Sequence, residues 1–369
     1  MTKFIPISEP SITQKEIEYV TDAVKSGWVS SLGYYISEFE KKFAKYIGVK
    51  YALATSNGTT ALHLALVSLG IGKDSEIIIP DLTFIATANA VTYTGAKPVM
   101  VDIDPETWCM DPKVVKKAVT EKTKAIIPVH LYGHPVNMDE INKIAREHGL
   151  YVVEDAAEAH GAEYKGKKVG SLGDCGVFSF YGNKIITTGE GGMIITNDEK
   201  LYEKAKFLRD HAMSKEKKYW HTEIGYNYRI TNLQAALGLA QLDRIDELIE
   251  KKIQIFNWYK EFLGDMEGIR LNPQKKWAKN VFWMVCLVLD KEFGISRDEL
   301  MVKLKEKGID TRPFFYPMTE MPMYNICNTY NPIAKSLSER GLNLPSGINL
   351  KEKEVKWITE NIMKITENL

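Results

Sequence analysis

Residues 151–197 read YVVEDAAEAHGAEYKGKKVGSLGDCGVFSFYGNKIITTGEGGMIITN, and this stretch decides the fold class. It contains three short runs rich in β-branched residues, at 151–156, 176–182 and 192–197. The runs are apolar almost throughout, which is typical of strands buried on both faces of a sheet. Four similar runs come earlier, at 51–56 (YALATS), 76–80 (EIIIP), 97–104 (KPVMVDID) and 124–133 (KAIIPVHLYG).

Amphipathic segments lie between these runs. Residues 136–148 (VNMDEINKIAREH), for example, place apolar side chains at the spacing of one helical face. Such alternation predicts an α/β fold in which a mostly parallel sheet lies between two layers of helices, a three-layer α/β/α architecture.

The character of the sequence changes near residue 230. Residues 232–262 predict one or two long helices, and a strand-like run at 281–289 and a helical segment at 296–308 follow. We therefore expect a large domain over residues 13–250 and a smaller C-terminal α/β domain over residues 251–369. Residues 1–12 contain two prolines and predict an extended N-terminal arm.

The composition argues against several classes of protein. The 48 Lys and Arg residues balance the 48 Asp and Glu residues, so no overall charge favours nucleic acid or a membrane surface. The N-terminus lacks a signal-peptide core, and no run approaches the roughly 20 apolar residues of a membrane span. The four cysteines are scattered, as free thiols in a reducing compartment are. We expect a cytoplasmic protein without a metal site.

Open α/β sheets bind ligands at the carboxyl ends of their strands, so polar residues there are candidates. The first lie in SNGTTALHLAL (56–66), where Gly58 and Thr59 can begin a helix. The first amides of a helix lack partners and favour an anion such as phosphate. The alternative is an ordinary capped turn.

Two further candidates follow later strands. Asp155, beside Glu154, ends a run and could face a cation in a cleft, or both carboxylates could form a solvated turn. Lys184 comes five residues after Ser179 and just before a glycine-rich turn. Burial there would lower its pKa and make it a nucleophile toward an aldehyde. The alternative is a surface lysine whose stem covers apolar neighbours.

A fourth polar segment, GYNYRITNLQAA (225–236), opens the long helical region. Its Asn227, Arg229 and Thr231 are either binding residues or capping and turn residues, and the sequence favours neither interpretation.

The order of phosphate turn, strand-end aspartate, Ser-x4-Lys and glycine-rich turn resembles fold-type-I pyridoxal 5′-phosphate (PLP) enzymes. Among them the chain resembles the sugar-nucleotide aminotransferases of the DegT/DnrJ/StrS type. The likeness extends from residues 27–40 to residues 341–346. It lies in SNGTTALHLAL, PDLTFIATANAV, PVHLYGHP, VVEDAAEAHGA, SLGDCGVFSFYGNKIITTGEGGM and GYNYRITNLQAALGLAQL.

The resemblance implies PLP as the cofactor and a role for each candidate. Lys184 binds PLP covalently and later moves a proton, and Asp155 keeps the pyridine nitrogen protonated. Phe84 lies against the ring face and Glu158 near the ring's 3′-oxygen. His160 is left without an assigned role.

The same resemblance implies that Gly58, Thr59 and Ser179 hold the phosphate. Asn227 is expected to complete this site from a neighbouring subunit. The chain is therefore expected to form a homodimer with shared active sites, and a tetramer stays open.

The resemblance also implies a substrate. Glu158 and the segment TRPFFYPM (311–318) favour a subgroup that transfers the amino group of L-glutamate to C4 of GDP-4-keto-6-deoxymannose, for surface polysaccharide such as O-antigen. Amination of a UDP- or dTDP-linked keto sugar, at C3 or C4, is the close alternative. A PLP-dependent dehydratase, which replaces the lysine by histidine, and a non-catalytic regulator are distant ones. Candidate contacts to the nucleotide, with domain packing as the alternative, are Trp28, Ser30, Ser31, Arg312 and Tyr316.

Overall fold

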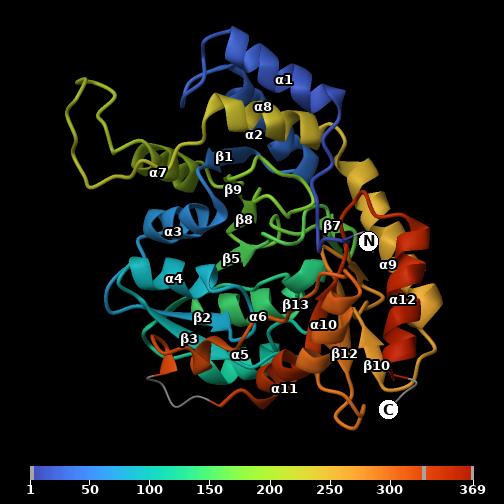
Figure 1. The fold of residues 1–369 in the computed structure, drawn as a ribbon. Helices are drawn as coiled ribbons and strands as arrows, with labels where there is room; N and C mark the ends of the chain where they lie inside the picture. The colour runs from blue at the N-terminus through green and yellow to red at the C-terminus, as the bar shows by residue number, and fades with distance from the viewer. Residues whose placement is uncertain (1–3, 326–329, 367–369) are drawn as a thin grey trace.

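The central sheet sets the architecture of the molecule, which a computed structural model describes over residues 4–325 and 330–366 (Figure 1). Its seven strands have the order β1-β9-β8-β5-β4-β2-β3, and β9 runs antiparallel to both of its neighbours. Each strand corresponds to one of the seven apolar runs. The strands are β1 (Tyr51–Thr55), β2 (Glu76–Pro80), β3 (Lys97–Val101), β4 (Thr123–Ile126), β5 (Tyr151–Asp155), β8 (Cys175–Ser179) and β9 (Gly192–Thr196).

Helices cover both faces of this sheet, because its strands project apolar side chains to both sides. Phe178 and Ile195 belong to a core shared with α2, α5, α6 and α8, whereas Val177 and Ile194 face α3, α4 and α7. This confirms the expected three-layer α/β/α fold. The helices are α1 (Gln14–Lys25), α2 (Tyr34–Ile47), α3 (Gly58–Ser68), α4 (Ala86–Tyr93), α5 (Pro112–Ala118), α6 (Met138–His148), α7 (Glu199–Arg209) and α8 (Asn232–Leu242).

A smaller C-terminal unit lies beside the central sheet (Figure 1). Its four-stranded antiparallel sheet has the order β10-β12-β14-β13, and α9, α10 and α12 share its core. The predicted domain boundary at residue 250 falls inside α9 and stays a prediction. The elements are α9 (Ile245–Leu263), β10 (Ile269–Leu271), β12 (Val285–Leu289), α10 (Arg297–Glu306), β13 (Arg312–Pro313), β14 (Gly341–Leu344) and α12 (Glu352–Thr366).

Shorter elements complete the described chain. A three-stranded sheet has the order β11-β6-β7. The elements are η1 (Leu131–Gly133), β6 (Glu163–Tyr164), β7 (Lys167–Lys168), β11 (Ala278–Lys279), η2 (Met318–Glu320) and α11 (Pro332–Arg340).

The strand expected over residues 281–289 is shorter than its apolar run. β12 begins at Val285, because Phe282 has a φ of 49°, in the left-handed region that does not continue a strand. The Asn280 side chain accepts a hydrogen bond of 2.8 Å from the Phe282 N–H and holds this bend. Residues 281–284 therefore form a bend that leads into β12.

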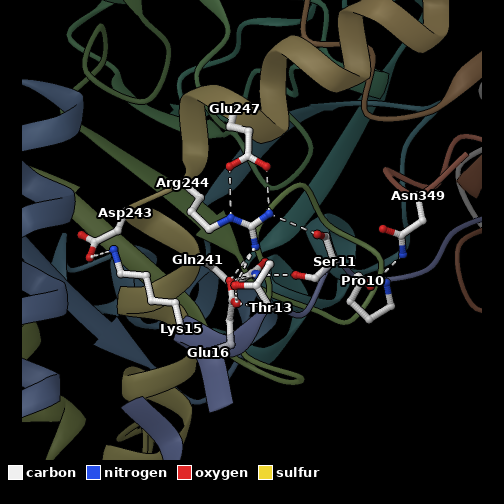
Figure 2. Close-up of polar contacts among 10 residues, drawn as sticks. All are labelled: Pro10, Ser11, Thr13, Lys15, Glu16, Gln241, Asp243, Arg244, Glu247 and Asn349. Atoms are coloured by element: carbon white, nitrogen blue, oxygen red, sulfur yellow. Dashed lines mark hydrogen bonds and ion pairs between the residues drawn. The ribbon is translucent and has the colours of Figure 1, made fainter. Parts of the chain in front are cut away.

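The N-terminal arm connects the two units. Ile5 forms a parallel β-bridge with Ile309 of the C-terminal unit. Figure 2 shows the arm farther along the chain, where the Arg244 guanidinium donates to the Ser11 hydroxyl (3.3 Å) and pairs with the buried Glu16 carboxylate (2.9 Å). These contacts fix the arm to α1 and to the start of α9.

Three further findings concern residues 4–325 and 330–366. No helix in these ranges combines the length and the apolar content that crossing a bilayer requires. Within the same ranges no three His, Cys, Asp or Glu side chains gather where they could hold a metal ion. Cys109, Cys175 and Cys286 are unpaired and buried, and Cys327 lies outside the described residues.

Candidate active site

A cavity of about 600 Å³ lies at the carboxyl ends of the central strands. The turns that follow β1, β2, β5 and β8 all contribute to it, as expected for ligand sites in open α/β sheets. Seven of the predicted cofactor residues line it, namely Gly58, Thr59, Phe84, Asp155, Glu158, Ser179 and Lys184.

Lys184 lines this cavity with a nearly buried side chain, which is 11% exposed. Its backbone N–H closes a turn onto the Tyr181 carbonyl at 2.9 Å. The Nζ atom lies 3.7 Å from Glu158 Oε1 and 3.7 Å from the ring centroid of Trp283. Burial lowers the pKa of Lys184, and the two nearby carboxyls oppose this shift. The surface-lysine interpretation is therefore wrong.

Asp155 ends β5 as a buried carboxylate. Thr87 donates a hydrogen bond of 2.8 Å to Oδ2, and the Ala157 N–H donates one of 3.2 Å to Oδ1. Burial raises the pKa of Asp155, and these hydrogen bonds and Lys184 lower it. Since Asp155 has no ion-pair partner within the described residues, its carboxylate fits a cationic group of a bound molecule.

The adjacent Glu154 has a different environment. Its two carboxylate oxygens accept hydrogen bonds of 2.6 to 2.7 Å from three backbone amides and one of 3.0 Å from His130 Nε2. Glu154 therefore anchors the 170–173 loop against β5, whereas Asp155 faces the cavity. The interpretation of this pair as a solvated turn is wrong, because both residues are buried. The three amides belong to Gly170, Leu172 and Gly173.

The start of α3 provides a cradle for an anion. Asn57 caps this helix, its Oδ1 accepting from the Thr60 N–H at 2.8 Å, and Gly58 and Thr59 of the first turn line the cavity. The helix dipole and these amides favour a phosphate. A Cβ added at Gly58 would lie 2.9 Å from the Cβ of Ser179, so the close approach of the two turns requires glycine.

Glu158 connects the loop after β4 to Lys184. Its Oε2 accepts a hydrogen bond of 2.7 Å from the Tyr132 N–H, and its Oε1 faces the Lys184 amine. Burial raises the pKa of Glu158 to about 7, although the Lys184 amine and this hydrogen bond oppose the rise. Burial therefore drives both members of the Lys184–Glu158 pair toward their neutral forms.

These residues fit PLP as a set. The cavity offers an amine for the aldehyde, a buried carboxylate without a cation, and a helix N-terminus for the phosphate. We call Gly58, Asp155, Ser179 and Lys184 the strand-end floor. The half-exposed Phe84 ring also lines the cavity.

Other cavity residues were absent from the sequence predictions. Trp283 and Phe315 line the cavity from the side of the C-terminal unit. The Tyr132 ring lies between them, stacked on Trp283 (centroids 6.2 Å apart, 16° between planes) and on Phe315 (5.5 Å, 12°). We call these three residues the aromatic wall. One hint of this wall was present in the sequence, since Trp283 stands near the start of the run predicted as a strand over residues 281–289.

Several predicted residues do not line the cavity. Asn227 is exposed, and its Oδ1 accepts from Arg229 Nε at 3.3 Å. Thr231 caps α8, so the capping interpretation is confirmed for that residue. His160 is buried, with its ring 5.3 Å from Phe178 and 5.7 Å from Phe180, and burial lowers its pKa to about 3.

The predicted nucleotide contacts also lie outside the cavity. The carbonyls of Trp28 and Ser30 accept hydrogen bonds of 2.7 and 2.6 Å from Asn232, and Ser31 follows in the same loop. Arg312 pairs with Asp310, and the half-exposed Tyr316 ring lies 6.0 Å from the Arg297 guanidinium. The roles of all five in nucleotide binding stay predictions.

Comparison with known proteins identifies the class of enzyme. GDP-perosamine synthase of Escherichia coli O157:H7 is 47% identical over 360 residues, 98% of each chain, and that of Caulobacter vibrioides is 48% identical over 353 residues, 95% of each. The structure of Helicobacter pylori PseC, an aminotransferase of pseudoaminic acid biosynthesis, superposes with a TM-score of 0.94 at 29% identity over the whole of both chains. The expected enzyme class and its cofactor, PLP, are confirmed. Residues 10–363 match the family described as DegT/DnrJ/EryC1/StrS aminotransferases, and the chain belongs to that family.

Proposed function

We propose that this enzyme transfers the amino group of L-glutamate to C4 of GDP-4-keto-6-deoxymannose and releases GDP-perosamine and 2-oxoglutarate. The observation that carries the reaction class is the buried Lys184 amine, which shares one cavity with Asp155 and the start of α3. The choice of sugar is supported by the two GDP-perosamine synthases, which match nearly the whole chain at 47 and 48% identity.

PLP, when bound, supplies an electron sink for the carbon that gains or loses a proton. Lys184 Nζ is placed to hold the cofactor covalently and, once released, to carry that proton. The Asp155 carboxylate would pair with the pyridine N–H, because it is buried and forms no ion pair within the described residues. The backbone amides of Gly58 and Thr59 and the Ser179 hydroxyl would bind the phosphate, and Phe84 would cover one face of the ring.

Burial favours the unprotonated, reactive form of the Lys184 amine. A protonated amine can neither attack a carbonyl nor accept a proton, so the lowered pKa of Lys184 raises the fraction of active amine near neutral pH. Glu158 lies 3.7 Å away and takes up the released proton, since burial has raised its pKa to about 7. Its position supports the proposed contact with the ring's 3′-oxygen.

We further propose a homodimer in which Asn227 of each subunit completes the phosphate site of the other. The connection between α7 and α8 extends away from the body of the chain (Figure 1) and exposes the large apolar side chains of Tyr219, Trp220 and Ile224. Such side chains favour burial against a second copy. Whether two dimers pair into a tetramer stays open.

Mixed dimers test the shared site. Lys184→Ala and Asn227→Ala chains, each inactive or impaired alone, are co-expressed with different tags. If Asn227 acts across the interface, random pairing gives about a quarter intact sites and recovers that share of activity. No recovery, with mixed dimers demonstrated by pull-down, would place Asn227 in its own subunit's site or in none.

The sugar is tested by assaying amino transfer from L-glutamate to GDP-, UDP- and dTDP-linked 3- and 4-keto sugars. We expect turnover on GDP-4-keto-6-deoxymannose, with NMR placing the new amine at C4. Preference for a UDP- or dTDP-linked sugar would replace the substrate and keep the reaction class.

We also propose that the reaction occurs in the cytoplasm and supplies surface polysaccharide such as O-antigen. The three unpaired, buried cysteines fit a reducing compartment. An amino sugar activated by a nucleotide is a donor for glycosyl transfer, which supports a place before polysaccharide assembly.

A further inference from the structure

Trp283 contacts the Lys184 amine through its indole ring. It comes from the bend at 281–284, is almost fully buried, and lines the cavity. The Nζ atom lies 3.7 Å from the centroid of its ring, within the range of a cation–π interaction. The amine therefore has two partners at equal distance, an indole face and the Glu158 carboxyl.

The indole ring is held in place from several directions. Its Nε1–H donates a hydrogen bond of 2.8 Å to the carbonyl of Asn183, the residue before Lys184. One face stacks on Tyr132, and the Trp283 N–H donates to the Tyr132 carbonyl at 3.2 Å. The ring and the turn that carries Lys184 are thus joined directly, so neither can shift alone.

A second buried lysine fixes the backbone at Trp283. Lys252 on α9 is 1% exposed, and its Nζ donates to the carbonyls of Trp283 (2.7 Å) and Ser346 (2.6 Å). Within the described residues Lys252 forms no ion pair with a carboxylate. Such burial of an amine is unfavourable unless its hydrogen bonds are made, so Lys252 fixes these two loops at a defined spacing.

We propose that Trp283 is a positioning residue that holds the Lys184 amine beside Glu158 whenever the amine is not bonded to the cofactor, and that Lys252 keeps the indole in that place. A free lysine side chain would otherwise sample several rotamers. The proton that Lys184 carries must be delivered at one carbon. Confining the amine to one position therefore increases the fraction of time in which it can reach that carbon. The effect on turnover rests on the proposed function, but the contact itself is a property of the chain alone.

The contact predicts a change in the acidity of Lys184. An indole face attracts the ammonium form, whereas a leucine of similar apolar character excludes water without this attraction. Replacing the ring by leucine therefore lowers the pKa of the Lys184 amine further. Phenylalanine keeps a weaker ring face and loses the N–H that binds Asn183, so its effect is intermediate.

The test uses the apo-protein. Wild type, Trp283→Leu and Trp283→Phe are labelled with acetic anhydride between pH 6 and 11, and mass spectrometry follows the peptide that contains Lys184. We expect the pKa of Lys184 to fall by about one unit in the leucine variant and by less in the phenylalanine variant. The titratable groups around the amine are unchanged in all variants, namely Asp155, Glu158, His160, Tyr181 and Glu190.

Trp258→Leu is the matched control, because this tryptophan contacts Lys251 with the amine 4.4 Å from the ring centroid, on α9. It should leave the titration of Lys184 unchanged. A Lys184 pKa in Trp283→Leu equal to or above that of wild type would overturn the proposal. If the leucine variant does not fold, Trp283→Phe serves as the test instead. An unchanged pKa of Lys184 in that variant would likewise overturn the proposal.

Kinetics then separates positioning from packing. In Trp283→Phe we expect kcat to fall about tenfold with little change in the KM for L-glutamate. In Lys252→Met we expect the pKa of Lys184, measured by labelling, to shift in the same direction as in Trp283→Phe. Equal effects on kcat and KM would indicate general loss of packing and contradict the proposal. Labelling needs no substrate, so a different preferred sugar would leave this inference intact, and a failed labelling test would leave the sugar assignment intact.

Discussion

The strand-end floor and the aromatic wall, through its Trp283 and Phe315, line one cavity, yet they are built differently. The floor consists of polar side chains and a glycine in the last residues of the parallel strands or in the segments just after them, where backbone geometry sets their positions. The wall is made by three stacked rings from two units of the chain, and each ring is placed by its neighbours. The floor is therefore a local product of strand ends, and the wall is a product of tertiary packing.

This difference corresponds to two kinds of role in the proposed reaction. The groups proposed to bond to the cofactor or to change its charge belong to the floor, and the wall is proposed to set where the floor's lysine lies. We therefore expect substitutions in the floor to remove steps of the reaction, and substitutions in or behind the wall to slow it.

Lys184→Ala should have the largest effect. Removing the amine removes both the covalent attachment of the cofactor and the proton carrier, so kcat should fall by at least about 10³-fold. Turnover with L-glutamate and the GDP-linked keto sugar is the measurement, with thermal unfolding as the check on folding. Since the amine is buried without a strong ion pair at 3.7 Å, the unfolding temperature should change little. Normal turnover in this variant would remove Lys184 from the mechanism.

Asp155→Asn should be next, with kcat lower by on the order of 10²-fold, because an amide cannot stabilise a protonated pyridine nitrogen. Bound cofactor, measured by absorbance, should be retained. Glu154→Gln provides the contrast, because the Glu154 carboxylate accepts hydrogen bonds from three backbone amides and does not line the cavity. That variant should lose about 2–4 kcal/mol of unfolding free energy and keep its kcat when folded. The reverse pattern would exchange the two roles.

The floor could be predicted from the sequence because its positions follow from strand ends. Seven apolar runs predicted the seven strands, and the polar residues after them became the cavity. The position at a strand end alone could not separate Glu154 from Asp155, and only the family resemblance chose Asp155. Their difference lies in which face each side chain takes and in the amides of a distant loop.

The wall could not be predicted in this way. Trp283 lies in an apolar run that indicates a strand, and the left-handed φ of Phe282 that ends this pattern depends on a hydrogen bond to Asn280. Its partners Tyr132 and Lys252 are both more than 30 residues away in the sequence. No local spacing therefore relates Trp283 to either of them. Asn227 is exposed in the single chain, and the role proposed for it requires a partner subunit.

Gly58→Ala tests the floor's closest approach, with an effect of intermediate size. The added methyl group would meet the Cβ of Ser179 at 2.9 Å and push apart the turns that hold the phosphate. We expect the Kd for PLP to rise about tenfold and kcat at saturating cofactor to change less. Gly182→Ala is the control, since a Cβ there meets nothing within 4 Å. An unchanged Kd in Gly58→Ala would mean that the cradle adjusts without cost.

Lys252→Met, behind the wall, should have the smallest effect on turnover, about a few-fold, and a distinctive effect on stability. Burial lowers the pKa of Lys252 to about 7, from 10.5 in an exposed lysine. Between these two values the unfolded chain binds a proton that the folded chain has released, so rising pH favours the folded state. The free energy of unfolding of wild type should therefore increase relative to Lys252→Met from pH 7 to 10, with a slope approaching about 1.4 kcal/mol per pH unit. Chemical denaturation at several pH values measures this difference, with the more exposed Lys251→Met as the control on the same helix. A difference that is independent of pH would show that Lys252 keeps its proton in the fold, and the two carbonyls would then hold a full ammonium ion behind Trp283.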